Sequence, residues 1–489
     1  MYKFSLTSLL LLWIVVSFSQ NNPSMDRNNY ESEWKKVAEL EQKSLPKSAS
    51  EAVNSILRAA LVDKNGPQVI KALVHQGKYD LALDAQNDTS VFRNLAGMVR
   101  ESDDTVEQSV LHSLLGELYM QYYQKDRWNI DQRTELGDFV PDDMKEWTRG
   151  ILYKKVVEHL NASIAAREEL TEAQVEAYSA VVELGKDSRE FYPSMFDFLV
   201  RRAIEVFSQI DTGKDLSRLL ARKGIDKELL FMPAGRFAQL PFDPKDTEHE
   251  LWALEAYRNL LGSLQGRGMD GSVLLTELDK LDYLSRLEGA HEAHALPSLE
   301  RLLQQWKGKA LSVEIIDKIA EHYQNEIGVL PEQDSLQREQ KTKELYELLL
   351  NTVRAYPAYE RVAVLENRLL QLTHPEFKVS GNKTFHPAGK KRLDVAYKNL
   401  QSLTAKLYRI DSPKEVEMVR WGVRKGLDAH RKFVRDIAVS LPERSPYLQG
   451  EAVLEIDVNE PGTYMLTFVS SPEAAVPESP EYYFSVSDL

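Results

Sequence analysis

The sequence contains no cysteine among its 489 residues. This absence excludes disulfide bonds, thiolate metal ligands and cysteine nucleophiles together. Long apolar runs are also missing after residue 20, whereas a membrane-spanning helix needs about 20 consecutive apolar residues. The chain has neither a Gly-x-Ser-x-Gly nucleophile elbow nor a phosphate-binding loop. We therefore expect a protein that is held together by packing alone and that belongs to none of the enzyme classes built on these groups.

Basic residues are outnumbered by acidic residues. The chain has 61 lysines and arginines against 75 aspartates and glutamates, which gives a formal net charge of −14. Binding to nucleic acid or to an anionic membrane surface depends on concentrated positive charge, and the sequence shows no basic stripe. We therefore expect protein partners and no nucleic acid.

Residues 1–19 have the pattern of a secretion signal. Lys3 supplies the positive charge, Leu9 to Phe18 the apolar core, and Ser17 to Ser19 the cleavage site. An apolar core of about ten residues is too short to span a bilayer. An uncleaved membrane anchor is the alternative. We expect a mature chain that begins at Gln20, has no transmembrane segment, and is exported to the periplasm or cell envelope of a Gram-negative-type bacterium.

Residues 20–210 have the pattern of a first block of amphipathic helices. In one segment Ala52, Val53, Ile56 and Ala60 recur at three- and four-residue spacing, which is the period of a helix with one buried face. Pro46 precedes this run, and the first turn of a helix is where proline is tolerated. The pattern therefore predicts a helix that begins near Pro46.

Two further helices have a sequence signature at their starts. Thr105 with Gln108, and Thr171 with Gln174, match the capping box, in which the two side chains bond to backbone N–H groups of the first turn. We expect one helix to follow Thr105 and another to span about 171–184.

A loose segment at residues 211–246 separates the first helical block from a second block at 247–375. Helical patterns in the second block occur near 272–289, 297–307, 311–326, 335–355 and 358–373. Two helices joined by a short turn form an αα-hairpin, which is the unit of helical-repeat solenoids. No fixed period is visible, such as the 34 residues of tetratricopeptide repeats. We therefore predict a tetratricopeptide-like array, with an irregular α-domain as the alternative.

Near residue 376 the apolar period changes to two, which is the period of β-strands. Alternating segments occur at 377–379, 393–397, 403–410, 437–439, 452–458, 463–469 and 482–486. Short strands at this density predict an immunoglobulin-like β-sandwich over 376–489. A charged, helix-forming excursion at 412–434 interrupts the strands. The predicted fold class is thus mainly α, with a helical-hairpin array followed by a C-terminal β-sandwich.

Two residue pairs imitate catalytic or metal-binding motifs. Ser44 and Lys47 have the spacing of serine–lysine hydrolases, but the companion motifs are missing and Pro46 favours a helix start. His291 and His294 resemble the helical zinc motif, but they are three residues apart instead of four. We interpret them as an exposed helix end just before Pro297, and the glycine-rich stretch 266–271, which follows no predicted strand, as a loop.

Acidic and aromatic groups favour structural roles in the same way. Asp103-Asp104 and Asp142-Asp143 stand at expected helix starts, where negative charge suits the helix dipole. Tyr119, Tyr122, Tyr123 and Trp128 form either a ligand-stacking surface or, as we expect, hairpin packing. We therefore assign no catalytic, cofactor-binding or metal-binding residues, expect no cofactor, and predict that the chain is not an enzyme.

Two groups of segments are similar to parts of one known family. The helical segments are Trp34, Leu45 to Ala49, Gln68 to Leu73 and His112 to Trp128. The strand segments are Tyr397 to Leu400, Leu407 to Ile410, Pro461 to Tyr464 and Phe484 to Ser487. The first group resembles the start of the large bacterial alpha-2-macroglobulin-like proteins. The second group resembles the opening and closing strands of a macroglobulin domain.

The resemblance implies a protease-trapping protein of the bacterial envelope. Members of that family present a bait segment, collapse around the protease that cleaves it, and in many cases capture it through a thioester between Cys and Gln. This chain has no cysteine and so cannot carry the thioester. The resemblance therefore implies either the front portion of a longer polypeptide or a stand-alone relative without the trap.

From the residues and the resemblance together we expect a non-catalytic arm of an exported endopeptidase inhibitor, which works by protein interaction or structural support. Its expected partners are downstream macroglobulin domains or proteases. The rival hypothesis is a stand-alone periplasmic scaffold or adaptor with a helical-repeat binding surface.

Overall fold

The computed structural model of the chain describes residues 30–83, 89–135, 137, 139–182, 185, 189, 192–210, 216–245, 248–287, 292–331, 334–410, 431–472 and 481–488. The expected secretion signal at 1–19 and residues 412–430 of the expected excursion therefore lie outside the described residues. Within the described parts of the chain, no helix has both the length and the apolar character needed to cross a membrane.

Two compact units divide the chain, one up to Ser298 and one from Leu299 onward. The first unit is helical, and the second combines helices with all of the β-strands of the described chain. The division differs from the predicted helical blocks, because the last helices of the expected second block belong to the same compact unit as the sheets.

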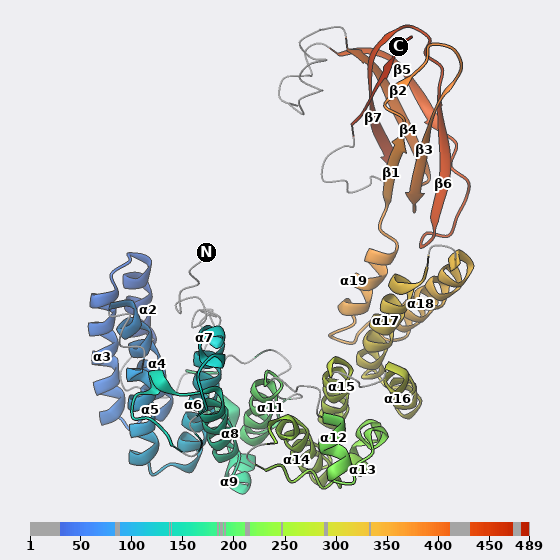
Figure 1. The fold of residues 1–489 in the computed structure, drawn as a ribbon. Coiled ribbons are helices and arrows are strands. Elements are labelled where there is room, and N and C mark those ends of the chain that lie inside the picture. The colour runs from blue at the N-terminus through green and yellow to red at the C-terminus, as the bar shows by residue number, and fades with distance from the viewer. Residues whose placement is uncertain are drawn as a thin grey trace. The chain divides into compact units, whose positions relative to one another are not determined.

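The first unit is built from helices that pack on their neighbours in sequence (Figure 1). Its α-helices are α2 (Tyr30–Gln42), α3 (Pro46–Val62), α4 (Gly66–Leu83), α5 (Ser90–Glu101), α6 (Thr105–Lys125), α7 (Arg127–Asp131), α8 (Arg149–Ser163), α9 (Arg167–Glu172), α11 (Met195–Phe207), α12 (Leu216–Arg222), α13 (Ala234–Phe237), α14 (Trp252–Gly266) and α15 (Asp270–Arg286). Four 3-10 helices lie between them: η2 (Met144–Glu146), η3 (Val175–Tyr178), η4 (Lys227–Phe231) and η5 (His249–Leu251). The helix α16 (Glu292–Gln305) contains the boundary between the units.

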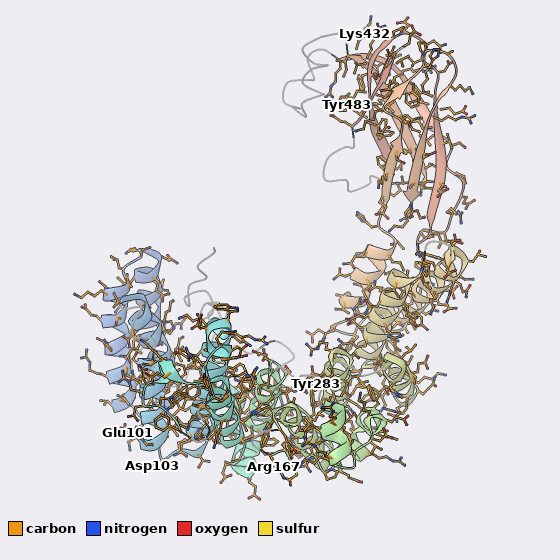
Figure 2. The ribbon with its side chains drawn as sticks, viewed as in Figure 1. Glu101, Asp103, Arg167, Tyr283, Lys432 and Tyr483 are labelled. Atoms are coloured by element: carbon orange, nitrogen blue, oxygen red, sulfur yellow. The ribbon has the colours of Figure 1, made fainter. Side chains whose placement is uncertain are left out.

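Helix starts in this unit follow the sequence only in part. Pro46 is the first residue of α3, as predicted. The predicted capping box of Thr105 and Gln108 was wrong, because Asp104, the residue before Thr105, caps α6. The Asp104 carboxylate accepts a hydrogen bond from the Glu107 N–H at 2.8 Å, and a carboxylate is the better partner for the positive helix end. Figure 2 shows Asp103 beside this turn, which follows Glu101 at the end of α5.

The expected helix over 171–184 was also wrong. The helix α9 ends at Glu172, and among the described residues up to Val182 only the single turn of η3 follows. The Ala173 carbonyl accepts the N–H of Met195 at 3.0 Å, so this backbone group is used by the start of α11 instead of by a longer helix. Tertiary pairing has here overridden local helix propensity.

The second unit begins with the end of α16 and three further helices, α17 (Ser312–Val329), α18 (Ser335–Ala355) and α19 (Ala363–Leu372). The strands that follow are β1 (Glu376–Gly381), β2 (Thr384–Phe385), β3 (Lys391–Lys398), β4 (Ser402–Ile410), β5 (Arg431–Val439), β6 (Gln449–Ile456), β7 (Gly462–Ser471) and β8 (Tyr482–Val486). All predicted strand segments coincide with these strands, apart from the last two residues of the segment 452–458. They form a three-stranded sheet in the order β1-β3-β6 and a five-stranded sheet in the order β2-β8-β7-β4-β5.

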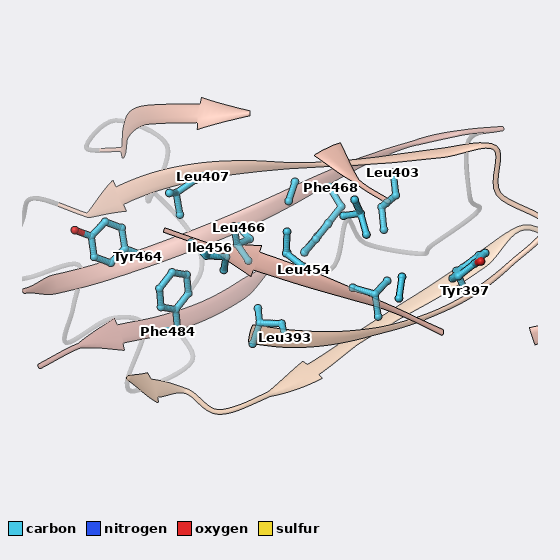
Figure 3. Packing of buried hydrophobic residues seen from close by; sticks show 14 of the residues in the cluster. Leu393, Tyr397, Leu403, Leu407, Leu454, Ile456, Tyr464, Leu466, Phe468 and Phe484 are labelled. Atoms are coloured by element: carbon cyan, nitrogen blue, oxygen red, sulfur yellow. The ribbon is translucent and has the colours of Figure 1, made fainter. Parts of the chain in front are cut away.

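One apolar core joins the two sheets (Figure 3). Alternate residues of β3, such as Leu393 and Val395, point into it, as do Leu403 and Leu407 of β4 and Phe484 of β8. Alternation of this kind leaves the intervening residues on the outer faces of the sheets. The mainly helical fold with a C-terminal β-region is thus confirmed.

The expected helical excursion ends earlier than predicted. The strand β5 already begins at Arg431, so residues 431–434 are strand. Their partners are on β4, where Ile410 pairs with Arg431 and Tyr408 with Phe433. Backbone N–H and C=O groups of residues 431–434 therefore bond to β4, and they do not need the intrahelical hydrogen bonds that the local sequence favours.

Candidate functional site

A ladder of four rings runs across α6, α8 and the segment before α8. The Trp147 ring stacks on Tyr119 with centroids 5.8 Å apart, and Tyr119 stacks on His159 at 5.5 Å. His159 in turn meets His112, with ring centroids 5.0 Å apart. Trp147, His159 and His112 are half-buried, whereas Tyr119 is buried. We call these four residues the ring ladder.

The helices bring the ladder together through their spacing and through one glycine. His112 and Tyr119 are seven residues apart on α6, which places them on the same helix face. Gly116 lies between them and faces α8, where a Cβ atom added to it would lie 2.7 Å from Leu160 Cδ2. Only a residue without a side chain allows this approach, so Gly116 lets His159 of α8 reach the rings of α6.

The two histidines are joined by a hydrogen bond between their Nδ1 atoms, which lie 2.8 Å apart. One ring must donate and the other accept, which requires at least one neutral imidazole. Burial lowers the pKa of His159 to about 4, and the nearby His112 adds to this effect. Burial also lowers the pKa of His112. Both rings are therefore neutral at pH 7.

Tyr119 is held in its neutral form as well. Burial, followed by the negative charge of Glu158, raises the pKa of its hydroxyl to about 12. The ladder thus consists of uncharged flat rings, flanked by Phe92 of α5, whose ring lies 4.8 Å from that of Tyr119. Such a surface can stack on apolar or flat groups of a ligand and can exchange hydrogen bonds with it.

Metal chemistry has no set of ligands in the parts of the chain that the structure describes. Among those residues, no group of three or more His, Cys, Asp or Glu side chains converges as a metal site would require. The ring ladder is therefore a candidate binding surface.

A second cluster surrounds His75 on α4. His75 is 4% exposed, and neither of its ring nitrogens has a hydrogen-bond partner. Its ring lies 4.7 Å from that of Trp34, and Glu41 lies beside it, where it accepts hydrogen bonds from Lys78 at 2.7 Å and from Tyr79 at 2.5 Å. Burial lowers the pKa of His75 to about 4. These groups form the interface of α2 with α4, so we assign them a structural role.

Ser44 and Lys47 do not form a catalytic pair. Ser44 has a φ of 54° in the turn between α2 and α3, where its N–H donates to the Glu41 carbonyl. Lys47 is exposed in the first turn of α3. No hydrogen bond joins their side chains in the described structure, so the turn explains both residues.

Of the two candidate histidines near Pro297, His291 lies outside the described residues. His294 is half-buried and packs on Phe231, with ring centroids 5.2 Å apart. The expected helix end before Pro297 was wrong, because α16 runs from Glu292 through Pro297. Pro297 is the sixth residue of α16, so the helix continues through it although proline supplies no N–H to the hydrogen-bond ladder.

The structure divides the expected tyrosine–tryptophan cluster. Tyr119 and Tyr123 are buried and Tyr122 is half-buried, in agreement with hairpin packing, but Trp128 is 77% exposed on α7. The aspartate pairs cap helices, as predicted, because the Asp143 carboxylate accepts the Lys145 N–H at 2.9 Å in addition to the Asp104 cap. The loop expected over 266–271 is shorter in the structure, because Gly266 ends α14 and Asp270 begins α15; Gly268 has a φ of 69° between them.

Sequence reasoning missed His112, His159 and Trp147 as members of one site. His112 and His159 are 47 positions apart and lie on different helices, so no local spacing relates them. In comparisons with known proteins, no family model matches this chain, and no curated protein matches it either.

Proposed function

We propose that this chain is a non-catalytic arm of an exported alpha-2-macroglobulin-like endopeptidase inhibitor, located in the periplasm or cell envelope, and that it works by binding or positioning proteins. In this proposal the helices form a tetratricopeptide-like array, and residues 376–489 form a macroglobulin-like domain. The resemblance of the helical and strand segments to that family motivates the choice of inhibitor.

The observation that carries a binding role is the ring ladder. It offers the half-buried rings of His112, Trp147 and His159 beside the buried Tyr119, and its histidines and tyrosine are neutral at pH 7. Aromatic side chains supply large contact area at a small cost in conformational entropy, which is why they dominate protein interfaces.

A positioning role is supported by contacts within the second unit. The Tyr346 ring of α18 lies 4.4 Å from that of Tyr447, in the loop before β6. Arg444 in the same loop pairs with Glu339 at 3.3 Å, and the Asn399 amide donates to the Thr373 carbonyl at 2.6 Å. These three contacts join the β-sandwich to helix α18 and to the end of α19, which precede it in the same unit.

The first test is the size of the native polypeptide in its source cells, detected with antiserum against this chain. We expect a species several times larger than the 55.9 kDa of the present sequence. A stable native species near 55.9 kDa contradicts the inhibitor-arm proposal and favours a stand-alone scaffold or adaptor.

The second test uses the isolated chain with a set of endopeptidases. We expect neither inhibition nor a compacting shift in native gels, because the thioester is excluded and the trap would lie elsewhere. Protease-induced compaction beyond the clipping of loops contradicts the assignment of this chain as an arm.

A further inference from the structure

The strand β5 lies at one end of the five-stranded sheet and pairs with β4. On its other side it has no strand partner among the described residues. Residues 432–436 are exposed without alternation, so neither face of this stretch is buried, although Arg435 reaches the end of the other sheet at Asp457. An edge strand of this kind presents unpaired backbone N–H and C=O groups to another chain.

A row of large side chains leads from this edge across one face of the sheet. Phe433 pairs with Tyr408, Tyr408 with Met465, and Met465 with Tyr483. Their sequence neighbours Leu407, Leu466 and Phe484 point into the core, so the row lies on the opposite face of the sheet. On that face Met465 is fully buried and Tyr408 and Tyr483 are half-buried. Phe433, which is 53% exposed, ends the row on β5, the end strand of this sheet among the described residues.

Within this row Phe433 is the member that an added strand would meet first. Its ring touches Tyr408 edge-on, with centroids 5.7 Å apart, which fixes its orientation. Cross-strand neighbours on one face are the unit of sheet stabilisation. A strand added to β5 would therefore place one of its side chains beside Phe433 and extend the row.

The charge of the edge restricts its partner. The strand carries Arg431, Lys432 and Arg435 against one acidic residue, Asp436, in a chain whose net charge is −14. Arg431 pairs with Glu481 at 3.1 Å and Arg435 donates to the Asp457 carbonyl at 2.7 Å, whereas no interaction of Lys432 is found in the described structure. Figure 2 labels Lys432 in this part of the sandwich, with Tyr483 on β8. Two copies of β5 would oppose like charges, which disfavours self-pairing.

We propose that β5 is a docking edge for an extended, acidic segment of a protein partner, which adds to the five-stranded sheet as a sixth strand. The backbone of β5 supplies the hydrogen bonds, Phe433 supplies the apolar contact, and Lys432 with Arg435 selects acidic side chains. The inference rests on the proposed function, since it names one binding surface of the proposed arm.

The test uses the full chain and a fluorescent peptide of about ten residues that alternates valine and glutamate. A second peptide with lysine in place of glutamate is the charge control. We expect the acidic peptide to bind, to protect the amides of β5 from hydrogen exchange, and to weaken at high salt. We expect Lys432→Glu to weaken binding about fivefold or more, and Phe433→Thr to weaken it without changing its salt dependence.

The matched control is Lys378→Glu on β1, one of the two edge strands of the other sheet, where Lys378 is likewise exposed. We expect this variant to bind the acidic peptide as the parent does. Equal binding of the two peptides, undiminished binding by Lys432→Glu, or no binding of either peptide overturns the proposal. A concentration-dependent dimer that Lys432→Glu abolishes would assign the edge to a second copy and also overturn it. None of these outcomes changes the native-size or protease results, so failure of this surface and failure of the proposed function are separate.

Discussion

The Nδ1 atoms of His112 on α6 and His159 on α8 lie 2.8 Å apart and share one hydrogen bond. This contact joins two neighbouring helices that also pack through Gly116 and Leu160. It couples the ring ladder to the stability of the first unit, so the ladder can be tested by unfolding measurements without a known ligand.

Replacing one histidine of the pair should lower the free energy of unfolding by more than the loss of its own contacts, because the other histidine is left without a hydrogen-bond partner. In His112→Ala the Nδ1 atom of His159 loses its partner in a half-buried site, and we expect a loss of about 1–2 kcal/mol in the free energy of unfolding. In the double variant His112→Phe/His159→Phe no polar atom is stranded. The double variant should therefore lose less than the sum of the single Phe variants, by about 0.5–1.5 kcal/mol in urea unfolding.

The control for this pair is His374→Ala, because His374 is exposed after α19. We expect it to change the free energy of unfolding by less than about 0.5 kcal/mol. Additive effects of the two Phe substitutions would show that the histidines do not interact in solution.

Two glycine-to-alanine substitutions should change the stability of the protein in opposite directions. Gly116→Ala places a Cβ atom 2.7 Å from Leu160 Cδ2, and overpacking of this kind costs about 1–3 kcal/mol. Gly97→Ala, in the middle of α5, meets nothing closer than Arg100 Nη2 at 4.0 Å. It should stabilise the protein by about 0.5–1 kcal/mol, because alanine loses less backbone entropy in a helix. Urea unfolding of both variants checks the pair, and a stable Gly116→Ala would refute the close approach of α6 and α8.

The first unit should become less stable as the pH is lowered, and His75 should account for part of this loss. Burial lowers its pKa in the folded state from 6.5 to about 4, whereas Glu41 beside it opposes the shift and Lys78 and Lys71 reinforce it. The unfolded chain therefore binds more protons between these values. The stability that neutral His75 allows is fully present above about pH 6.5 and is lost as the pH falls toward 4.

The variant His75→Phe isolates this contribution. Between pH 7 and about 4.5, the free energy of unfolding of the parent should fall by about 2 kcal/mol more than that of the variant, as measured by urea unfolding at each pH. At pH 7 the variant should be as stable as the parent or more so, since it removes two buried nitrogens without partners. Parallel pH profiles of parent and variant would mean that His75 does not titrate from a buried site.

Part of the fold could be predicted because its signal is local. The period of two in β3 and β4 marks which residues face the core, and Leu393, Leu403 and Leu407 are indeed buried there. Pro46 begins α3 because the fixed φ of proline suits the first turn in any context. The helix that was expected over 171–184 does not form, because the Ala173 carbonyl accepts a hydrogen bond from the N–H of Met195, which is remote in sequence.

The candidate surfaces depend on relationships that no local pattern contains. Tyr119, Tyr122, Tyr123 and Trp128 are close in sequence, yet the structure buries Tyr123 and exposes Trp128, and Tyr119 joins His159 and Trp147 instead. The edge position of β5 likewise follows from sheet order, and the sequence had indicated a helix for residues 431–434.

The sequence by itself determined the absence of thiol chemistry, the acidic charge, the succession of amphipathic helices and the change to strands near residue 376. These properties are composition and periodicity, which each segment carries alone. Only the tertiary structure decided that His112 meets His159 and that Phe433 lies on the end strand of the five-stranded sheet that the structure describes. Both depend on which helices and strands become neighbours, and that is fixed by packing and by the satisfaction of backbone hydrogen bonds across the whole unit.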